Sequence, residues 1–178
     1  MPPTGPRKYS KPVLDLPWTP LQVILGIAGL VCTGSMIGIL IYYWPQLPEV
    51  IPTHFGASGL PDGWGSKVSL IYLAGGGVVL YLLMFILSRY PHLYNYVCAI
   101  TESNAEVQYR MASTFMVVLA NVIIWMFTFM VWQTIQTALG QSKGMGSWFL
   151  PVFIFLTFGP VVVYLIASLR ARDASSRK

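Results

Sequence analysis

Apolar and polar positions follow one another along this chain in long blocks. Four apolar blocks of about twenty residues or more are separated by polar, turn-rich segments. An α-helix rises about 1.5 Å per residue, so about 20 apolar residues cross the hydrocarbon core of a bilayer. The pattern predicts an all-α, polytopic integral membrane protein with four transmembrane helices. The predicted spans are residues 21–43, 68–88, 111–137 and 148–169.

The segments between these blocks consist of two tails and two longer connections, and the connection at 44–67 is expected to be a structured loop. The tail at 1–20 is Pro-rich and basic, and the tail at 170–178 is basic. The other connection, residues 89–110, is a polar link. The aromatic residues that follow the first span indicate an uncleaved signal anchor, because a cleavage site needs small residues.

The polar link is expected to contain the start of the third helix. Glu106 and Arg110 lie four positions apart, so their side chains face each other once the helix has begun. The third helix is therefore predicted to begin before the membrane, near Asn104.

Composition supports a membrane protein and excludes several other classes. The chain is 55% hydrophobic and 10% charged, with a mean hydropathy of +0.62. Its net charge of +5 comes from basic residues at the ends of apolar blocks, with no basic stripe, so the lipid bilayer and not nucleic acid is the expected partner. No charge lies in the middle of a span, which argues against an ion pump. No cofactor motif is present, and no cofactor is expected.

The distribution of basic residues predicts the orientation. Nine of the eleven Lys and Arg residues lie in the two tails and the 89–110 link. The other two, Lys67 and Lys143, lie in the remaining loops. Because cytoplasmic segments carry the excess of Lys and Arg, both termini are expected in the cytoplasm of a cell-membrane protein. The 44–67 loop is then extracytoplasmic.

Glycines in the first two spans are candidates for helix packing. The first span contains a G-x-x-x-G pair, Gly34 and Gly38, and the second contains Gly75, Gly76 and Gly77. Small residues allow the backbones of two membrane helices to approach closely. We favour packing of these two glycine sets within one chain. Homo-oligomerisation through the first set, or a hinge at the second, remains an alternative.

The 44–67 loop carries the chain's candidate chemistry. His54 lies two residues after Pro52, and Asp62 lies in a Pro-Asp-Gly turn that can fold it back toward His54. Glu49 is a third candidate oxygen ligand, although the spacing matches no tight zinc pattern. Lys67 is expected at the membrane surface. A His–Asp hydrogen bond that only shapes the loop, a recognition site, and a weak metal or catalytic site all remain open.

The loop resembles the signature of a bacterial membrane domain of unknown function that also forms the N-terminal part of SdpI-like immunity and signalling proteins. The run is L-P-x-x-I-P-T-H-F-x-x-x-G-x-P-D-G-W-G-S-K. Its matching positions are Pro52, His54, Phe55, Gly56, Gly59, Pro61, Asp62, Gly63, Trp64, Ser66 and Lys67. A second block comprises Asn95 and the segment T-E-x-N-A-E-x-Q-Y-R, which includes Glu106, Gln108, Tyr109 and Arg110.

The resemblance implies the fold and the membrane placement. The candidate recognition residues of the loop are His54, Asp62, Lys67, Pro52, Trp64 and Glu49. The chain departs from the family pattern at Gly56, where Asn is common. Full SdpI proteins also carry further spans after the fourth, so an activity carried there is expected to be absent from this chain.

Three functions follow from these observations. The favoured one is a non-enzymatic membrane module, SdpI-like, that recognises a peptide, a toxin or a membrane-protein partner through its extracytoplasmic His/Asp loop. A second is a metal-dependent site at the outer membrane face that uses His54 with Asp62 or Glu49. The third is an accessory subunit of a membrane transporter, which would oligomerise through Gly34 and Gly38.

Overall fold

The computed structural model describes residues 11–175, with side chains to residue 171. Several of the basic residues counted for the orientation lie outside the described residues: Arg7, Lys8, Arg177, Lys178 and the side chain of Arg172. The helices are α1 (Pro20–Tyr43), α2 (Ser69–Leu87), α3 (Ala105–Ala138) and α4 (Phe149–Ser175). The smaller elements are β1 (Val50–Phe55), β2 (Pro61–Ser66) and two 3-10 helices, η1 (Trp44–Gln46) and η2 (Pro91–Leu93).

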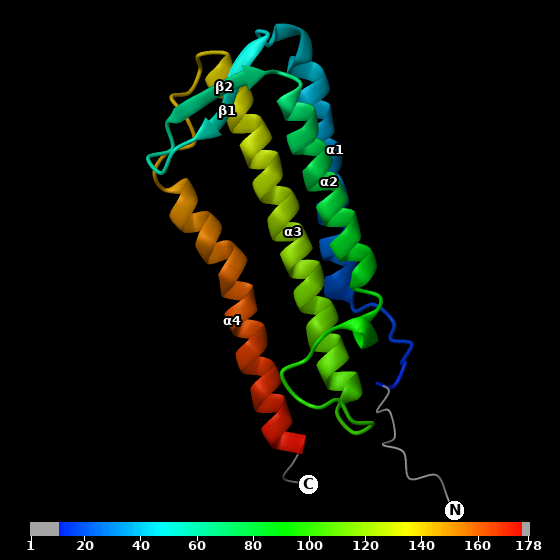
Figure 1. Ribbon diagram of the computed structural model, residues 1–178. Helices are drawn as coiled ribbons and strands as arrows, with labels where there is room; N and C mark the ends of the chain where they lie inside the picture. The colour runs from blue at the N-terminus through cyan, green and yellow to red at the C-terminus, as the bar shows by residue number, and fades with distance from the viewer. Residues whose placement is uncertain (1–10, 176–178) are drawn as a thin grey trace, which may run out of the picture.

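All four α-helices are long and apolar enough to span a membrane, so the chain is a multi-pass membrane protein. The expectation of an all-α fold is wrong in one respect. The segment between α1 and α2 forms an antiparallel two-stranded sheet of β1 and β2, which lies across one end of the helices (Figure 1). The Pro-Asp-Gly chemistry that indicated a turn instead begins the second strand of a hairpin.

Helix length explains how α3 serves both ends of the molecule. The 19 residues of α2 measure about 28 Å, close to the thickness of the hydrocarbon core. The 34 residues of α3 measure about 51 Å, so this helix projects beyond the core. It begins at Ala105, and Arg110 Nε lies 3.0 Å from Glu106 Oε1. The predicted early start of the third helix is therefore confirmed.

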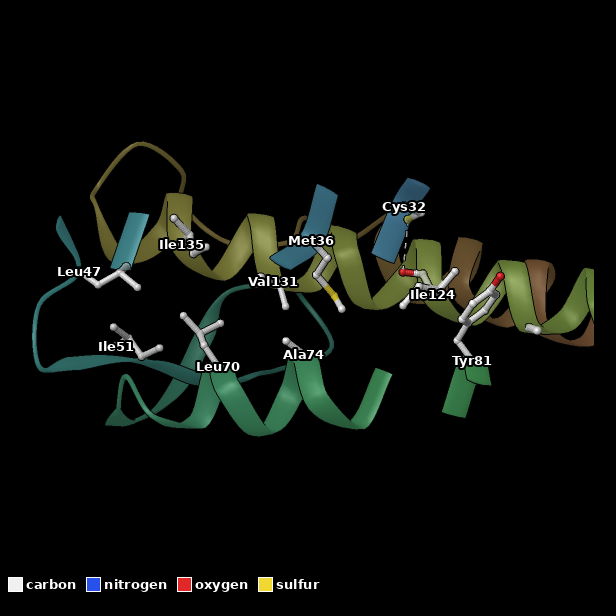
Figure 2. Packing of buried hydrophobic residues seen from close by; sticks show 11 residues of the cluster. Cys32, Met36, Leu47, Ile51, Leu70, Ala74, Tyr81, Ile124, Val131 and Ile135 are labelled. Atoms are coloured by element: carbon white, nitrogen blue, oxygen red, sulfur yellow. Dashed lines mark hydrogen bonds between the residues drawn. The ribbon is translucent and has the colours of Figure 1, made fainter. Parts of the chain in front are cut away.

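The helix α3 is the central element of the fold. In Figure 1 it runs between α4 on one side and α1 and α2 on the other, and it contacts all three. The main core lies between α1, α2 and α3 and continues into the hairpin segment. Figure 2 shows Leu47 and Ile51 of that segment beside Leu70 and Ile135 of the helices. The helices thus support the hairpin from below.

Two glycines of α1 lie directly beneath aromatic side chains of α2. A Cβ on Gly26 would lie 2.9 Å from the Phe85 ring, and one on Gly29 would lie 2.4 Å from the Tyr81 ring. The buried Tyr81 hydroxyl donates a hydrogen bond to the Gly26 carbonyl at 3.0 Å. The close approach of α1 and α2 therefore depends on these two glycines.

The structure places the glycines selected from the sequence differently. No described atom lies within 4 Å of a Cβ placed on Gly34, Gly38 or Gly75. Of the other two, Gly77 lies against the Phe127 ring of α3, at 2.7 Å from an added Cβ, and Gly76 only reaches the edge of that ring at 4.0 Å. The expectation that Gly34 and Gly38 pack against another helix of the same chain is therefore corrected. A G-x-x-x-G spacing only identifies a helix face without side chains. Whether that face is packed depends on the side chain that lies opposite it.

Candidate functional site

Two irregularities in the hairpin determine which side chains face outward. The paired positions run from Pro52–Trp64 to His54–Gly63 and then to Phe55–Pro61. Thr53 on β1 and Asp62 on β2 are therefore extra residues, one in each strand. An extra residue shifts the alternation of side chains along a strand. As a result His54 is exposed although Pro52, two positions earlier, is fully buried.

His54 and Asp62 meet on the exposed face of the hairpin. His54 Nδ1 lies 2.5 Å from Asp62 Oδ1, and the side chains are 73% and 54% exposed. Because an ionised carboxylate only accepts hydrogen bonds, Nδ1 is the donor and Nε2 is left for an external group. The contact between His54 and Asp62 is therefore present, and no hydrogen bond within the described residues engages His54 Nε2.

One glycine on β2 and one directly after β1 leave room for this pair. A Cβ on Gly63 would lie 2.9 Å from the Cβ of His54, and one on Gly56 would lie 2.9 Å from Asp62 Oδ2. Gly56, where the resembled family commonly has Asn, thus lies directly beside the Asp62 carboxylate.

The base of the hairpin is closed by a second ion pair. Lys67 Nζ lies 2.9 Å from Glu49 Oε1, and the Lys67 amide donates to the Glu49 carbonyl at 3.0 Å. The Lys67 ammonium also lies 5.3 Å from the centre of the Trp44 ring. Glu49 is therefore engaged with Lys67 and does not join His54 and Asp62.

The tip of the hairpin is held by the loop between α3 and α4. The Met145 amide donates to the Gly59 carbonyl at 2.8 Å, and Met145 is buried. Gly59 has a φ of +77°, and a Cβ there would lie 2.4 Å from the Gly146 backbone. The sequence analysis missed Gly144, Met145 and Gly146. Their only signal is the high glycine content of residues 140–146.

An exposed aromatic side chain lies close to Asp62 in the sequence of β2. Trp64 is 60% exposed and lies on the strand that carries Asp62, two positions away. Among the residues named for the loop, His54, Asp62 and Trp64 are thus presented outward. Pro52 is buried beneath the hairpin, and Lys67 pairs at its base with Glu49, whose side chain is exposed.

The described residues contain no group of three or more His, Cys, Asp or Glu side chains that could hold a metal ion. Among them, a metal at His54 would find Asp62 as its neighbour, while Glu49 is held by Lys67. Tight zinc sites use three or four protein ligands, so this arrangement has too few donors for one.

The second block of the resemblance, which includes Asn95, Gln108, Tyr109 and Arg110, is spread over several faces of the end opposite the hairpin. Gln108 and Ser168 of α4 are both fully buried and exchange two hydrogen bonds, at 3.0 and 2.7 Å. Tyr109, also buried, donates to the Pro12 carbonyl at 2.9 Å. Arg110 pairs with Glu106, and Asn95 is exposed. These residues join α3 to its neighbours and form no single cluster.

The N-terminal segment packs on the 89–110 link, which the sequence did not indicate. Arg89 donates to the Leu16 carbonyl at 3.2 Å and lies over the Trp18 ring. Burial raises the pKa of both Tyr94 and Tyr96 in the link. Their hydroxyls therefore remain neutral donors, to the Leu87 and Pro91 carbonyls respectively.

Comparison with known proteins assigns the hairpin region to a described domain. Residues 31–75 match the family model described as Domain of unknown function (DUF1648). An uncharacterized protein of Archaeoglobus fulgidus is 37% identical over 60 residues, which cover 29% of this chain. The match spans 33% of that relative's own length. No solved structure matches the chain. The segment that is similar to this family model runs from the middle of α1 into α2, and it includes the whole hairpin with the His54–Asp62 pair.

Proposed function

We propose that this protein is a non-enzymatic recognition module of the SdpI-like kind, whose hairpin binds a peptide, a toxin or a membrane-protein partner outside the membrane. One observation carries the proposal. The exposed His54–Asp62 pair stands on a hairpin whose base is closed by the Glu49–Lys67 pair and whose tip is hydrogen-bonded to the loop between α3 and α4.

The energetics of the pair favour recognition over a purely structural role. Exposed ion pairs contribute about 0–1 kcal/mol to stability. The hairpin is already held by buried Ile51 and Pro52, by the Glu49–Lys67 pair and by the Met145 contact. The pair itself adds little stability, and the rest of the hairpin already holds it in place. It is therefore preorganised for a ligand, because binding does not have to order the side chains that make the contacts.

The chemistry of the face defines the expected ligand. His54 Nε2 can accept a hydrogen bond, Asp62 contributes negative charge, and Trp64 offers an exposed aromatic surface. The charges of Glu49 and Lys67 compensate each other at the base. A peptide segment with a donor or basic group next to an apolar or cationic side chain fits this face.

The orientation belongs to the same proposal. The excess of Lys and Arg in the tails and the 89–110 link supports a cytoplasmic position for both termini in the cell membrane. The hairpin, at the other end of the helices (Figure 1), then faces outward.

Site-specific cross-linking tests the recognition role. A photo-reactive phenylalanine analogue at Val50, which is 60% exposed on β1, is expected to form a discrete adduct in cells. His54→Ala or Asp62→Asn should each reduce this adduct by about tenfold, because each removes a polar contact to a charged or hydrogen-bonded partner.

The control is Ser58→Ala at the exposed tip of the same hairpin, which should leave the adduct unchanged. The amount of inserted protein and its melting temperature are measured in parallel for every variant. An adduct that persists at full strength in both the His54 and Asp62 variants would remove the basis of the proposal.

A further inference from the structure

An apolar groove runs between α3 and α4, on the side of the molecule away from α1 and α2. Its volume is about 1140 Å³. Its α3 wall includes Met111, Phe115, Val118 and Val122. Its α4 wall includes Ile154, Phe158, Val162 and Val163.

The groove exists because α4 touches α3 through a few large side chains. Near one end Phe115 stacks on Tyr164, with ring centres 4.8 Å apart, and near the other Phe129 stacks on Phe149 at 5.4 Å. Gly159 lies between these contacts, and no described atom comes within 4 Å of a Cβ placed on it. The aromatic stacks hold the helices apart, and the glycine leaves the space unfilled.

The length of the groove matches one leaflet of a bilayer. Along α3 it extends from Arg110 to Val122, which is about 18 Å at the helical rise. Half of the hydrocarbon core measures about 15 Å. A lipid acyl chain has about this length. A helix from a second copy would instead run along α3 and α4 through the full thickness of the hydrocarbon core. Length therefore favours a lipid.

The groove has one basic end, at Arg110. The guanidinium Nε pairs with Glu106, and within the described residues no hydrogen bond engages the two terminal nitrogens. Arg110 also borders a small polar notch of about 30 Å³ that is shared with Arg89 and Ser113. A lipid phosphate at this level would bind the Arg110 guanidinium, which also pairs with Glu106. The acyl chain of the same lipid would lie in the apolar groove.

We propose that the α3–α4 groove binds an anionic phospholipid from the leaflet next to the 89–110 link, with an acyl chain in the groove and the phosphate on Arg110. The site is independent of the hairpin and of the recognition role proposed above. It also does not depend on which side of the membrane the link occupies, because the leaflet is defined by Arg110.

Native mass spectrometry of the full chain with defined lipids tests the site. Equal amounts of phosphatidylglycerol and phosphatidylcholine with identical acyl chains are added to the detergent-purified protein. The unaltered protein should retain phosphatidylglycerol about fivefold over phosphatidylcholine, as one cation near an anionic headgroup implies. Arg110→Gln should abolish the preference, and Arg110→Lys should keep it, because a lysine also binds phosphate.

Groove filling tests the acyl-chain half of the proposal. Gly159→Leu should lower the retention of both lipids, because the new side chain occupies the groove. Its matched control is Gly75→Leu on α2, which also enters open space but does not line the groove.

The matched control for Arg110→Gln is Arg170→Gln, which removes one exposed charge at the same end of the molecule but does not line the groove. The proposal is overturned if the unaltered protein retains both lipids equally. Equal losses in the Arg110 and Arg170 variants, or in the Gly159 and Gly75 variants, overturn it as well. So does a lipid-free dimer that disappears in Gly159→Leu, because that result would assign the groove to a second copy.

Discussion

Gly29 and Gly34 lie on the same helix and differ in what lies against them. The Tyr81 ring covers Gly29 so closely that its hydroxyl oxygen would lie 2.5 Å from an added Cβ. The same hydroxyl is bonded to the Gly26 carbonyl, so the ring is fixed in place. Gly34 has open space beside it. A glycine is therefore required for helix packing at position 29 but not at position 34.

Gly29→Ala is expected to lower the free energy of unfolding by about 1–3 kcal/mol, as overpacking of a filled core does. Gly34→Ala should leave it nearly unchanged. The measurement is thermal unfolding of the purified protein in detergent. Adding Tyr81→Phe to Gly29→Ala should recover part of the loss, since it removes the crowded hydroxyl. Equal melting temperatures for the two single variants would contradict this role of Gly29.

At the scale of single residues, local chemistry was readable from the sequence and register was not. The sequence indicated a pair between His54 and Asp62 through a turn at Pro-Asp-Gly, but the structure brings the two side chains together through the pairing of β1 and β2. The extra residues Thr53 and Asp62 depend on how two strands align, which no single position encodes. The same holds for Glu49, whose carboxylate is taken by Lys67 across the base of the hairpin.

The hairpin and the loop between α3 and α4 behave as one structural element. The tip of the hairpin contributes the Gly59 carbonyl, and the loop contributes the Met145 amide. Gly144 also lies against this contact, since a Cβ there would be 2.2 Å from the Gly59 oxygen. The ends of α1, α2, α3 and α4 that lie next to the hairpin are thereby joined through a single layer of non-helical chain.

Gly59→Ala is expected to separate the two parts of this layer. Alanine is disfavoured at a φ of +77°, and its Cβ would lie 2.4 Å from the Gly146 backbone. The Met145 amide should then exchange with solvent deuterium about tenfold faster or more, because its hydrogen bond to Gly59 is lost. Hydrogen exchange of a peptide that covers residues 141–148 measures the change. Ser58→Ala, one position away, serves as the control, and identical exchange in both variants would argue against the contact.

At the scale of elements, the apolar blocks predicted all four helices, because spanning a membrane demands a long run of apolar side chains. The sheet escaped prediction for a physical reason. β2 has the sequence PDGWGS, in which Pro, Asp and Gly are poor strand formers. Packing of β1 against the bundle through Ile51, which is fully buried, stabilises a strand pair that local propensity does not favour.

For the whole molecule, the arrangement of the helices separates two chemically different ends. The hairpin and the α3–α4 loop lie at one end, and the 89–110 link lies at the other (Figure 1). Among the described residues, Lys11, Arg89, Arg110 and Arg170 lie at the end of the link, and Lys67 and Lys143 lie at the end of the hairpin. Chemical labelling of one residue at each end can therefore test the orientation proposed above.

Membrane-impermeant maleimide is expected to label Ser58→Cys in intact cells, because Ser58 lies exposed at the tip of the hairpin. The native Cys98 in the link provides the internal control and should react only after the membrane is permeabilised. Labelling of Cys98 in intact cells, together with protection of the cysteine at position 58, would reverse the proposed orientation.

The hydrogen bond between Gly59 and Met145 also has a consequence for biosynthesis. The hairpin leaves the ribosome before α2, α3 and the loop that holds its tip. A nascent chain that has inserted only its first two helices therefore contains His54 and Asp62 but lacks the partner of Gly59. The exposed face reaches its final shape only after the third helix has crossed the bilayer. The proposed recognition by this face is thereby linked in time to the completion of membrane insertion.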